Sequence, residues 1–232
     1  EWTNLAGVGA SRTRLALVAG MAVLLALLWL GGAAYAVWPL WLAAAGWLLN
    51  LYWVTQYPHS SQQWHTTSRR LLMGVWVLLP CWVGFNVLRD SGAVWLLFVL
   101  LLVWTADIGA YFAGRRWGKH KLAPRVSPGK SWEGVYGGLA ATTLLAMLFA
   151  LWQPLGAMGG VALVVITAVV TLTSVLGDLF ESMLKRYRNI KDSSQLLPGH
   201  GGVLDRIDSL TAAIPIFALF YLQVLSLQVS AL

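Results

Sequence analysis

Long apolar segments alternate with short polar connections along almost the whole chain. A helix needs about 20 consecutive, mostly apolar residues to cross the hydrocarbon core of a bilayer. The apolar segments come close to this length. They predict an all-α, polytopic transmembrane helical bundle with about seven spans, forming a single integral membrane domain over residues 1–232. The expected spans are Leu15–Leu30, Tyr35–Val54, Leu71–Val87, Val94–Phe112, Val135–Leu151, Ala157–Leu176 and Leu210–Leu227.

Composition supports the same class of protein. Hydrophobic residues make up 58% of the chain and charged residues only 11%, against roughly 25% charged residues in an ordinary globular domain. The single cysteine, Cys81, lies in an apolar run, so it forms no intrachain disulfide and is expected to pack in the core. A soluble globular protein is therefore excluded.

The net charge of +7 would suit a nucleic-acid partner, but the distribution of the bases argues against one. Alternate connections between the expected spans hold 15 of the 16 Lys and Arg residues, and only Arg89 lies on the opposite side. Basic residues concentrate in cytoplasmic loops of membrane proteins. We therefore expect these connections, 1–14, 55–70, 113–134 and 177–209, to face the cytoplasm.

The most polar stretch, 182–208, holds three acids, five bases and a histidine within 27 residues. One Lys, Arg or Asp at the centre of a bilayer costs about 2.5 to 3.5 kcal/mol, so such groups tend to face water, a ligand or one another. A site is therefore expected at the cytoplasmic interface, in the segments 105–134 and 174–211.

Acidic residues stand on both sides of this stretch. Asp178, Glu181 and Lys185 recur at helical spacing and share one face if the helix continues. Simple pairing of these acids with Lys185 or Arg186 is the alternative. Asp205 and Asp208 begin the last helix, where the helix dipole alone also favours negative charge.

Carboxylates and bases around a glycine-rich loop indicate a metal–nucleotide site. Mg²⁺ typically takes one or two carboxylates and completes its shell with water and phosphate oxygens. Backbone N–H groups of the loop Gly199–Gly202 can approach an anion closely. His200 either donates to a phosphate or caps its own loop. The bases expected to hold phosphate are Lys185, Arg186, Lys191 and Arg206.

The segment 105–134 is a second candidate region. Asp107, a turn away from Tyr111, either lines the site or pairs with Arg115 or Arg116. The GKS at Gly129–Ser131 is no P-loop, because Pro124 stands where that motif needs glycine. Lys130 and Ser131 precede a helix, where phosphate is favoured. Ser131 alone could equally be an N-cap.

Both segments resemble the phosphatidate cytidylyltransferases, also called CDP-diacylglycerol synthases, of the bacterial type. The first match is S-x-x-K-R, K-D, P-G-H-G-G and L-D-R-I-D in order, from Ser182 to Asp208. The second is D-x-x-A-Y from Asp107, followed by G-K-H-K-L-x-P-x-x-S-P-x-K-S-x-E-G from Gly118. The opening EWTNLAG also resembles a segment that family members carry after two earlier spans, so the full protein is expected to have about nine.

The resemblance implies a Mg²⁺-dependent nucleotidyltransferase of the bacterial inner membrane that converts CTP and phosphatidate into CDP-diacylglycerol and pyrophosphate. It leaves a second cation and a homodimer open. The implied catalytic residues are Asp178, Asp205, Lys185 and Arg206. The implied metal ligands are Asp178, Asp205 and Asp208, with Asp192 as a further candidate. The implied phosphate-binding residues are Ser127, Lys130, Ser131, Arg186, Lys191, His200, Gly201 and Gly202, supported by Asp107, Tyr111 and Glu181.

Two other functions compete with this interpretation. A transporter or flippase of anionic lipids or phosphate compounds could use Asp107 as a proton relay, but would be expected to spread its polar residues through the depth of the spans. A CTP-dependent polyprenol kinase would use the same nucleotide. The order of the K-D, H-G-G and D-R-I-D motifs favours the cytidylyltransferase.

Overall fold

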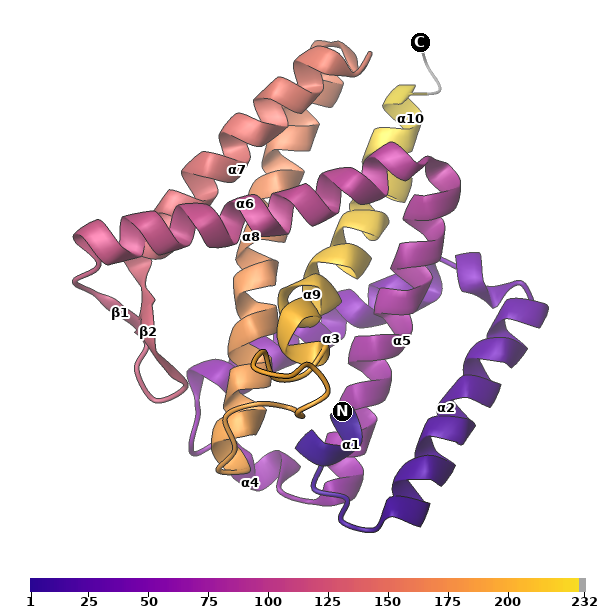
Figure 1. The fold of residues 1–232 in the computed structure, drawn as a ribbon. Coiled ribbons are helices and arrows are strands. Elements are labelled where there is room, and N and C mark those ends of the chain that lie inside the picture. Colours follow the sequence, from indigo (N-terminus) through magenta and orange to yellow (C-terminus); the bar gives the residue numbers. More distant parts are fainter. Residues whose placement is uncertain (230–232) are drawn as a thin grey trace.

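The computed structural model describes residues 1–229, which form a helical bundle with one short β-hairpin (Figure 1). The hairpin joins α6 to α7, and a loop without helix over residues 188–203 joins α8 to α9. The elements are α1 (Trp2–Leu5), α2 (Ser11–Leu30), the 3₁₀ turn η1 (Ala33–Tyr35), α3 (Trp38–Thr55), α4 (Ser61–Trp64), α5 (Thr67–Ser91), α6 (Ala93–Trp117), β1 (Lys121–Ala123), β2 (Ser127–Ser131), α7 (Trp132–Trp152), α8 (Gly156–Tyr187), α9 (Leu204–Phe220), the π-helical turn η2 (Tyr221–Leu225) and α10 (Ser226–Val229).

Six helical segments within residues 1–229 are long and apolar enough to cross a membrane: α2, α5, α6, α7, α8, and α9 together with η2. They coincide with six of the expected spans and confirm an all-α polytopic membrane protein. The expected span 35–54 is also helical, as the 18-residue α3, but it is not among the six. Its tryptophans and its buried Asn50 keep its mean hydropathy below that of the six.

The longest helix, α8, is longer than the bilayer core is thick, and the predicted acids lie in its last turns. It has 32 residues and is therefore about 48 Å long, since an α-helix rises about 1.5 Å per residue. The hydrocarbon core is about 30 Å thick. The apolar first part of α8 can span this core, while its last turns, from Asp178 to Lys185, extend to the interface. The helix continues through Asp178, Glu181 and Lys185, as the shared face predicted from their spacing requires.

Small residues let α6 and α7 approach closely. A Cβ added to Gly109 would lie 2.7 Å from the carbonyl oxygen of Gly137, and one added to Gly138 would lie 3.0 Å from that of Ala106. Close backbone approach through small residues is a common means of helix association in membranes. At the other end of α6, Phe98 is buried against Phe149 and Phe217. These contacts hold the two helices that flank the hairpin.

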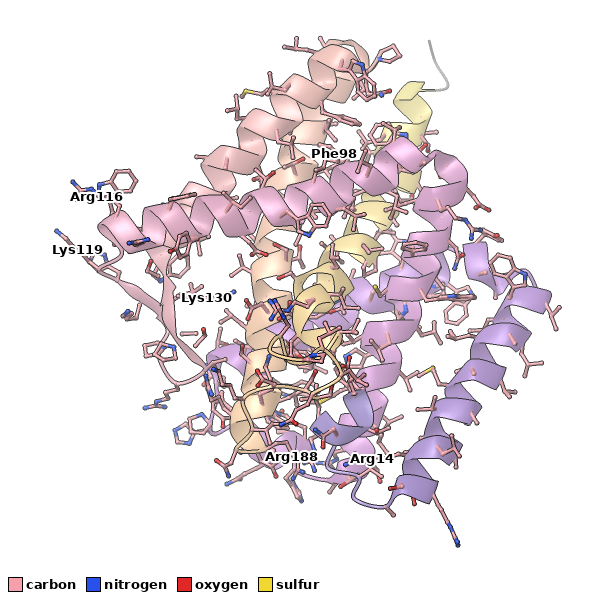
Figure 2. All side chains as sticks on the ribbon, viewed as in Figure 1. Arg14, Phe98, Arg116, Lys119, Lys130 and Arg188 are labelled. Carbon is pink, nitrogen blue, oxygen red and sulfur yellow. The ribbon has the colours of Figure 1, made fainter. Side chains whose placement is uncertain are left out.

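The hairpin was not expected from the sequence. Its strands pair antiparallel, with Lys121 opposite Ser131 and Ala123 opposite Ser127. Figure 2 shows Lys130 on the inner side of this hairpin, facing α8, while Arg116 and Lys119 point outward at the end of α6. The pairing therefore separates one lysine from the other bases of the segment and turns it towards the bundle.

Candidate active site

The site begins where α8 and α9 touch. A Cβ added to Gly177 would lie 2.6 Å from the carbonyl oxygen of Asp208 and 3.1 Å from Cα of Ser209. Only glycine permits this approach of the two backbones. It brings Asp178, the next residue of α8, close enough to Asp208 for their charges to interact.

This contact gives the first prediction. Gly177→Ala should push α8 away from α9, because the clash is with backbone, and should destabilise the protein by about 1–3 kcal/mol as well as lowering its activity. The matched control on the same helix is Gly160→Ala, whose Cβ would meet only Ala150 Cβ at 3.5 Å. Thermal unfolding in detergent measures both variants. Equal midpoints for the two would contradict the role assigned to Gly177.

Lys185 joins the acids of α8 and α9. Its Nζ lies 3.1 Å from Glu181 Oε2 and 2.8 Å from Asp205 Oδ1, and all three side chains are largely buried. The i,i+4 pair within α8 is the one that the alternative interpretation of these acids expected. The second partner, Asp205, comes from another helix. Lys185 is therefore the charged link between the two halves of the site.

Asp205 organises the loop before α9. Its carboxylate accepts hydrogen bonds from the backbone N–H of Ser193, at 2.9 Å to Oδ2, from Ser193 Oγ at 3.0 Å and from Gly202 N–H at 2.7 Å. With Lys185, these donors surround the carboxylate. Sequence analysis missed Ser193, whose only signal was its place beside Asp192.

Lys130 brings the hairpin to the acids of α8. Its Nζ lies 2.6 Å from Asp178 Oδ2, and Ser182 Oγ donates to Asp178 Oδ1 at 3.1 Å. Ser131 accepts from Gly134 N–H at 3.2 Å, so it does cap α7, as the alternative interpretation held. Two regions far apart in the sequence, 105–134 and 174–211, thus meet at the Lys130–Asp178 pair.

A polar cavity of about 360 Å³ opens at this pair. Asp107 lines it together with Asp178 and Lys130, and within residues 1–229 Asp107 forms no ion pair. Arg115 donates instead to Tyr111 Oη, at 3.0 Å. Asp107 therefore belongs to the cavity wall and is not a partner of the neighbouring arginines. The cavity is lined by Ala106, Asp107, Ala110, Tyr111, Gly114, Arg115, Gly129, Lys130, Ser131, Gly134, Val135, Gly138, Thr171, Val175 and Asp178.

A larger apolar cavity of about 960 Å³ adjoins it and shares Val135 and Val175 in its wall. Its other lining side chains come mainly from α3, α8 and the hairpin, with a smaller share from α9, and include Leu172 and Leu219. Arg125, from the hairpin turn, stands among them. A charged cavity and an apolar cavity thus lie side by side next to the hairpin.

Other predicted residues lie at the edge of this site. Arg186 Nε donates to the Val126 carbonyl at 3.2 Å, which ties α8 to the hairpin. His200 Nδ1 lies 3.2 Å from the carbonyl of Pro198, and Arg206 donates to the carbonyl of His200 at 2.6 Å, so both hold the loop itself. The remaining ones are not brought into the polar cavity: Ser127, Lys191, Asp192 and Gly201, which are exposed or half-buried, and Gly202, which is buried.

One carboxylate oxygen in the acid cluster lacks a donor. Glu181 Oε1 is buried and receives no hydrogen bond from the described part of the chain, and it lies beside Asp208. A buried carboxyl oxygen beside a second acid is stabilised either by nearby positive charge or by a proton that the two acids share. Residues 1–229 hold no group of three or more His, Cys, Asp or Glu side chains arranged to hold a metal ion by themselves. A cation held by these acids would therefore need part of its coordination shell from water or substrate, as Mg²⁺ does.

Glu1 is the second residue that sequence analysis missed. Its carboxylate accepts from Ser194 Oγ at 2.6 Å, from Val203 N–H at 2.8 Å and from Leu204 N–H at 2.7 Å. Partial burial raises the pKa of Glu1, but these hydrogen bonds outweigh the effect and leave its pKa below the usual value. Glu1 therefore stays charged at the start of α9.

Together, the fold and the site define a polytopic membrane protein with a charged cavity beside an apolar one. A family model described as the cytidylyltransferase family matches residues 1–224. The chain belongs to this family of nucleotidyltransferases.

Curated relatives agree with the family match. The chain is 51% identical over 226 residues to a phosphatidate cytidylyltransferase of Pseudomonas aeruginosa, covering 94% of this chain and 81% of that protein. It is 48% identical to the protein of the same name from Haemophilus influenzae, over 79% of this chain and 68% of the relative. A Staphylococcus epidermidis protein of that name is 41% identical over 60% of the chain and 53% of its own length.

Proposed function

We propose that this protein transfers CMP from CTP to phosphatidate, giving CDP-diacylglycerol and pyrophosphate. The observation that carries the proposal is the shared wall of the two chambers at Val135 and Val175. A lipid whose phosphate lies by Lys130 would find space for acyl chains on the other side of that wall. A transporter is not favoured, because the polar residues of the site gather at one end of α8.

The reaction joins two anions, so its barrier is largely electrostatic. A non-bridging oxygen of the lipid phosphate attacks the α-phosphorus of CTP and forms a new P–O bond. The bond from that phosphorus to the oxygen bridging to the β-phosphate breaks, and its electron pair leaves with pyrophosphate. No proton transfer is needed, because the attacking phosphate is already ionised near neutral pH. Fixed positive charge is what the protein must supply.

Lys130 and Lys185 are the proposed sources of that charge. Each is already directed by a carboxylate, Asp178 for Lys130 and the pair Glu181 and Asp205 for Lys185. This fixes their positions before substrate arrives, so little reorganisation is required in the transition state. Arg206, Arg186, Lys191 and His200 would meet the outer phosphates at the loop. Ser127 and Gly202 are proposed to help shape this entrance.

Asp178, Asp205 and Asp208 are the residues proposed to hold Mg²⁺, with Asp192 as a further candidate. Asp205 would have to exchange one of the donors that surround its carboxylate for the ion. When bound, the ion offsets negative charge on the reacting phosphates. The buried pair of Glu181 and Asp208 would be stabilised by positive charge or by a shared proton, and the second cation that the resemblance left open stays a prediction. The bacterial inner membrane, with the site facing the cytoplasm where CTP is present, is the proposed location. A homodimer remains a prediction.

The proposal is tested by product formation in mixed micelles of phosphatidate and detergent. Purified protein should release pyrophosphate only when CTP, phosphatidate and Mg²⁺ are all present, and EDTA should stop the release. Diacylglycerol in place of phosphatidate controls for an acceptor without the attacking phosphate. Release of pyrophosphate that does not depend on phosphatidate would contradict the proposal.

The apolar chamber leads to a prediction about chain length. Leu172→Trp should fill part of this chamber and raise the KM for long-chain phosphatidate about tenfold, while short-chain phosphatidate is used normally, because about 1.4 kcal/mol of lost apolar contact corresponds to that factor. Val161→Trp, on an exposed position of α8 outside the chamber, is the matched control. An equal effect on both chain lengths would show that the chamber does not hold acyl chains.

A further inference from the structure

The start of α9 is not capped by its own sequence. Val203 occupies the N-cap position and makes no side-chain hydrogen bond there. The first N–H groups of a helix need acceptors, and a carboxylate is favoured at this end. Glu1 supplies one, accepting from Val203 N–H with Oε1 and from Leu204 N–H with Oε2. A residue about 200 positions away therefore completes the helix that carries Asp205.

The same N-terminal segment also holds the loop before α9. Ser194 Oγ donates to Glu1 at 2.6 Å, and Asn4 Nδ2 donates to the carbonyl of Ser193 at 2.8 Å. Ser193 in turn gives its N–H and its hydroxyl to Asp205. One chain of hydrogen bonds thus runs from Asn4 of α1 through Ser193 to the carboxylate that binds Lys185, and Glu1 holds the neighbouring Ser194. In Figure 1 the N-terminus lies directly beside this loop.

Packing of α1 makes these contacts rigid. Trp2 Nε1 donates to the carbonyl of Arg70 at 2.8 Å, and the Trp2 ring stacks on Phe180 of α8, with centroids 6.4 Å apart. Leu5 is fully buried. Arg14 donates to Asn4 Oδ1 at 3.2 Å, which orients the Asn4 amide towards Ser193. α1 is therefore fixed to α5 and α8, and the loop is fixed to α1.

Gly202 packs directly against Ser193 and Glu1. A Cβ added to Gly202 would lie 2.2 Å from Ser193 Oγ and 2.5 Å from Glu1 Oε1. A side chain at this position would displace the hydroxyl of Ser193 and the carboxylate of Glu1. This explains one glycine of the G-G pair by packing around Glu1, in addition to any contact with phosphate.

We infer that Glu1 and Asn4 are positioning residues for CMP transfer, which hold the 193–204 segment so that Asp205 meets Lys185. The inference rests on the proposed function for its kinetic consequence, but the contact itself can be tested without activity. Neither residue reaches the polar cavity. Their effect should therefore fall on kcat more than on the KM for CTP.

The kinetic test uses the full-length protein with Glu1→Gln and Glu1→Ala. Glu1→Ala removes the acceptor that caps α9 and should lower kcat about tenfold with a nearly unchanged KM. Glu1→Gln keeps an acceptor oxygen and should have a smaller effect. Thr3→Ala, on the same short helix, is the control and should match wild type. In a cycle with Ser194→Ala, the two effects should not add, because both remove the same contact. Additive effects, or a changed KM alone, would overturn the inference.

Hydrogen exchange tests the contact between Glu1 and the 193–204 segment independently of activity. In Glu1→Ala the amides of Ser193, Val203 and Leu204 should lose protection at least tenfold, while amides in the middle of α7 keep theirs. Unchanged protection of these three amides would overturn the inference, whatever the activity. If wild-type protein makes no CDP-lipid, the proposed function fails. The exchange result still decides whether Glu1 holds the 193–204 segment.

Discussion

Asp178→Asn should lower the rate of CMP transfer to phosphatidate by at least about 10²-fold, the usual effect of removing one preorganised electrostatic group from an active site. Asp178 binds Lys130 across two elements and stands in the wall of the polar cavity. Asparagine has nearly the same shape and can still accept from Ser182, so the helix should remain folded. The loss would therefore come from charge: Lys130 is no longer directed, and a proposed Mg²⁺ ligand is removed.

The control for this variant is Asp90→Asn. Asp90 is also an acid in a membrane-length helix, but it lies at the opposite end of the bundle in an exposed pair with Arg89. Radiolabelled CTP, extracted into lipid, measures transfer by both variants, and their thermal midpoints show whether each is folded. Activity of Asp178→Asn within a factor of about three of wild type would remove Asp178 from the mechanism.

Lys185→Met should be the most destabilising substitution in the site. Lys185 is the partner of two buried acids, with side-chain exposures of 3% for Glu181 and 9% for Asp205. Removing one partner of a buried ion pair costs about 3–5 kcal/mol, because the remaining charge loses its compensation. The midpoint of thermal unfolding in detergent should fall by roughly 10 °C, and transfer should be lost.

Two further variants separate charge from packing at Lys185. Adding Glu181→Gln to Lys185→Met should restore part of the lost stability, since one of the uncompensated acids becomes neutral. Arg12→Met, at an exposed position on α2, should leave the midpoint unchanged. If the double variant is less stable than Lys185→Met, the loss is due to packing, and the ion-pair account of the site is wrong.

Much of this site could be predicted because it follows from the period of a helix. The spacing of Asp178, Glu181 and Lys185 predicted one shared face, and the structure confirms the Lys185–Glu181 pair on it. The spans were predictable for the same reason, since apolar length is a local property. The resemblance of the two motifs then placed the site in segments 105–134 and 174–211, and these segments do meet in the structure.

The cross-element partners could not be predicted. Lys130 was one of six bases in its segment, and only the hairpin, whose strands are three and five residues long, selects it for Asp178. The capping of α9 by Glu1 joins residues about 200 positions apart, and no local pattern signals it. The expected span at α3 shows a different limit of prediction from sequence. Its tryptophans lie in an otherwise apolar segment and keep its mean hydropathy below that of the other spans.

The most direct test of the whole account compares two labels in CTP. Protein in mixed micelles with phosphatidate is given CTP labelled with ³²P at either the α- or the γ-phosphate, and the lipid extract is counted. CMP transfer predicts that the α-label enters lipid, while the γ-label leaves in pyrophosphate. Label in lipid from the γ-position would instead mean phosphoryl transfer by a CTP-dependent kinase, and would contradict the account.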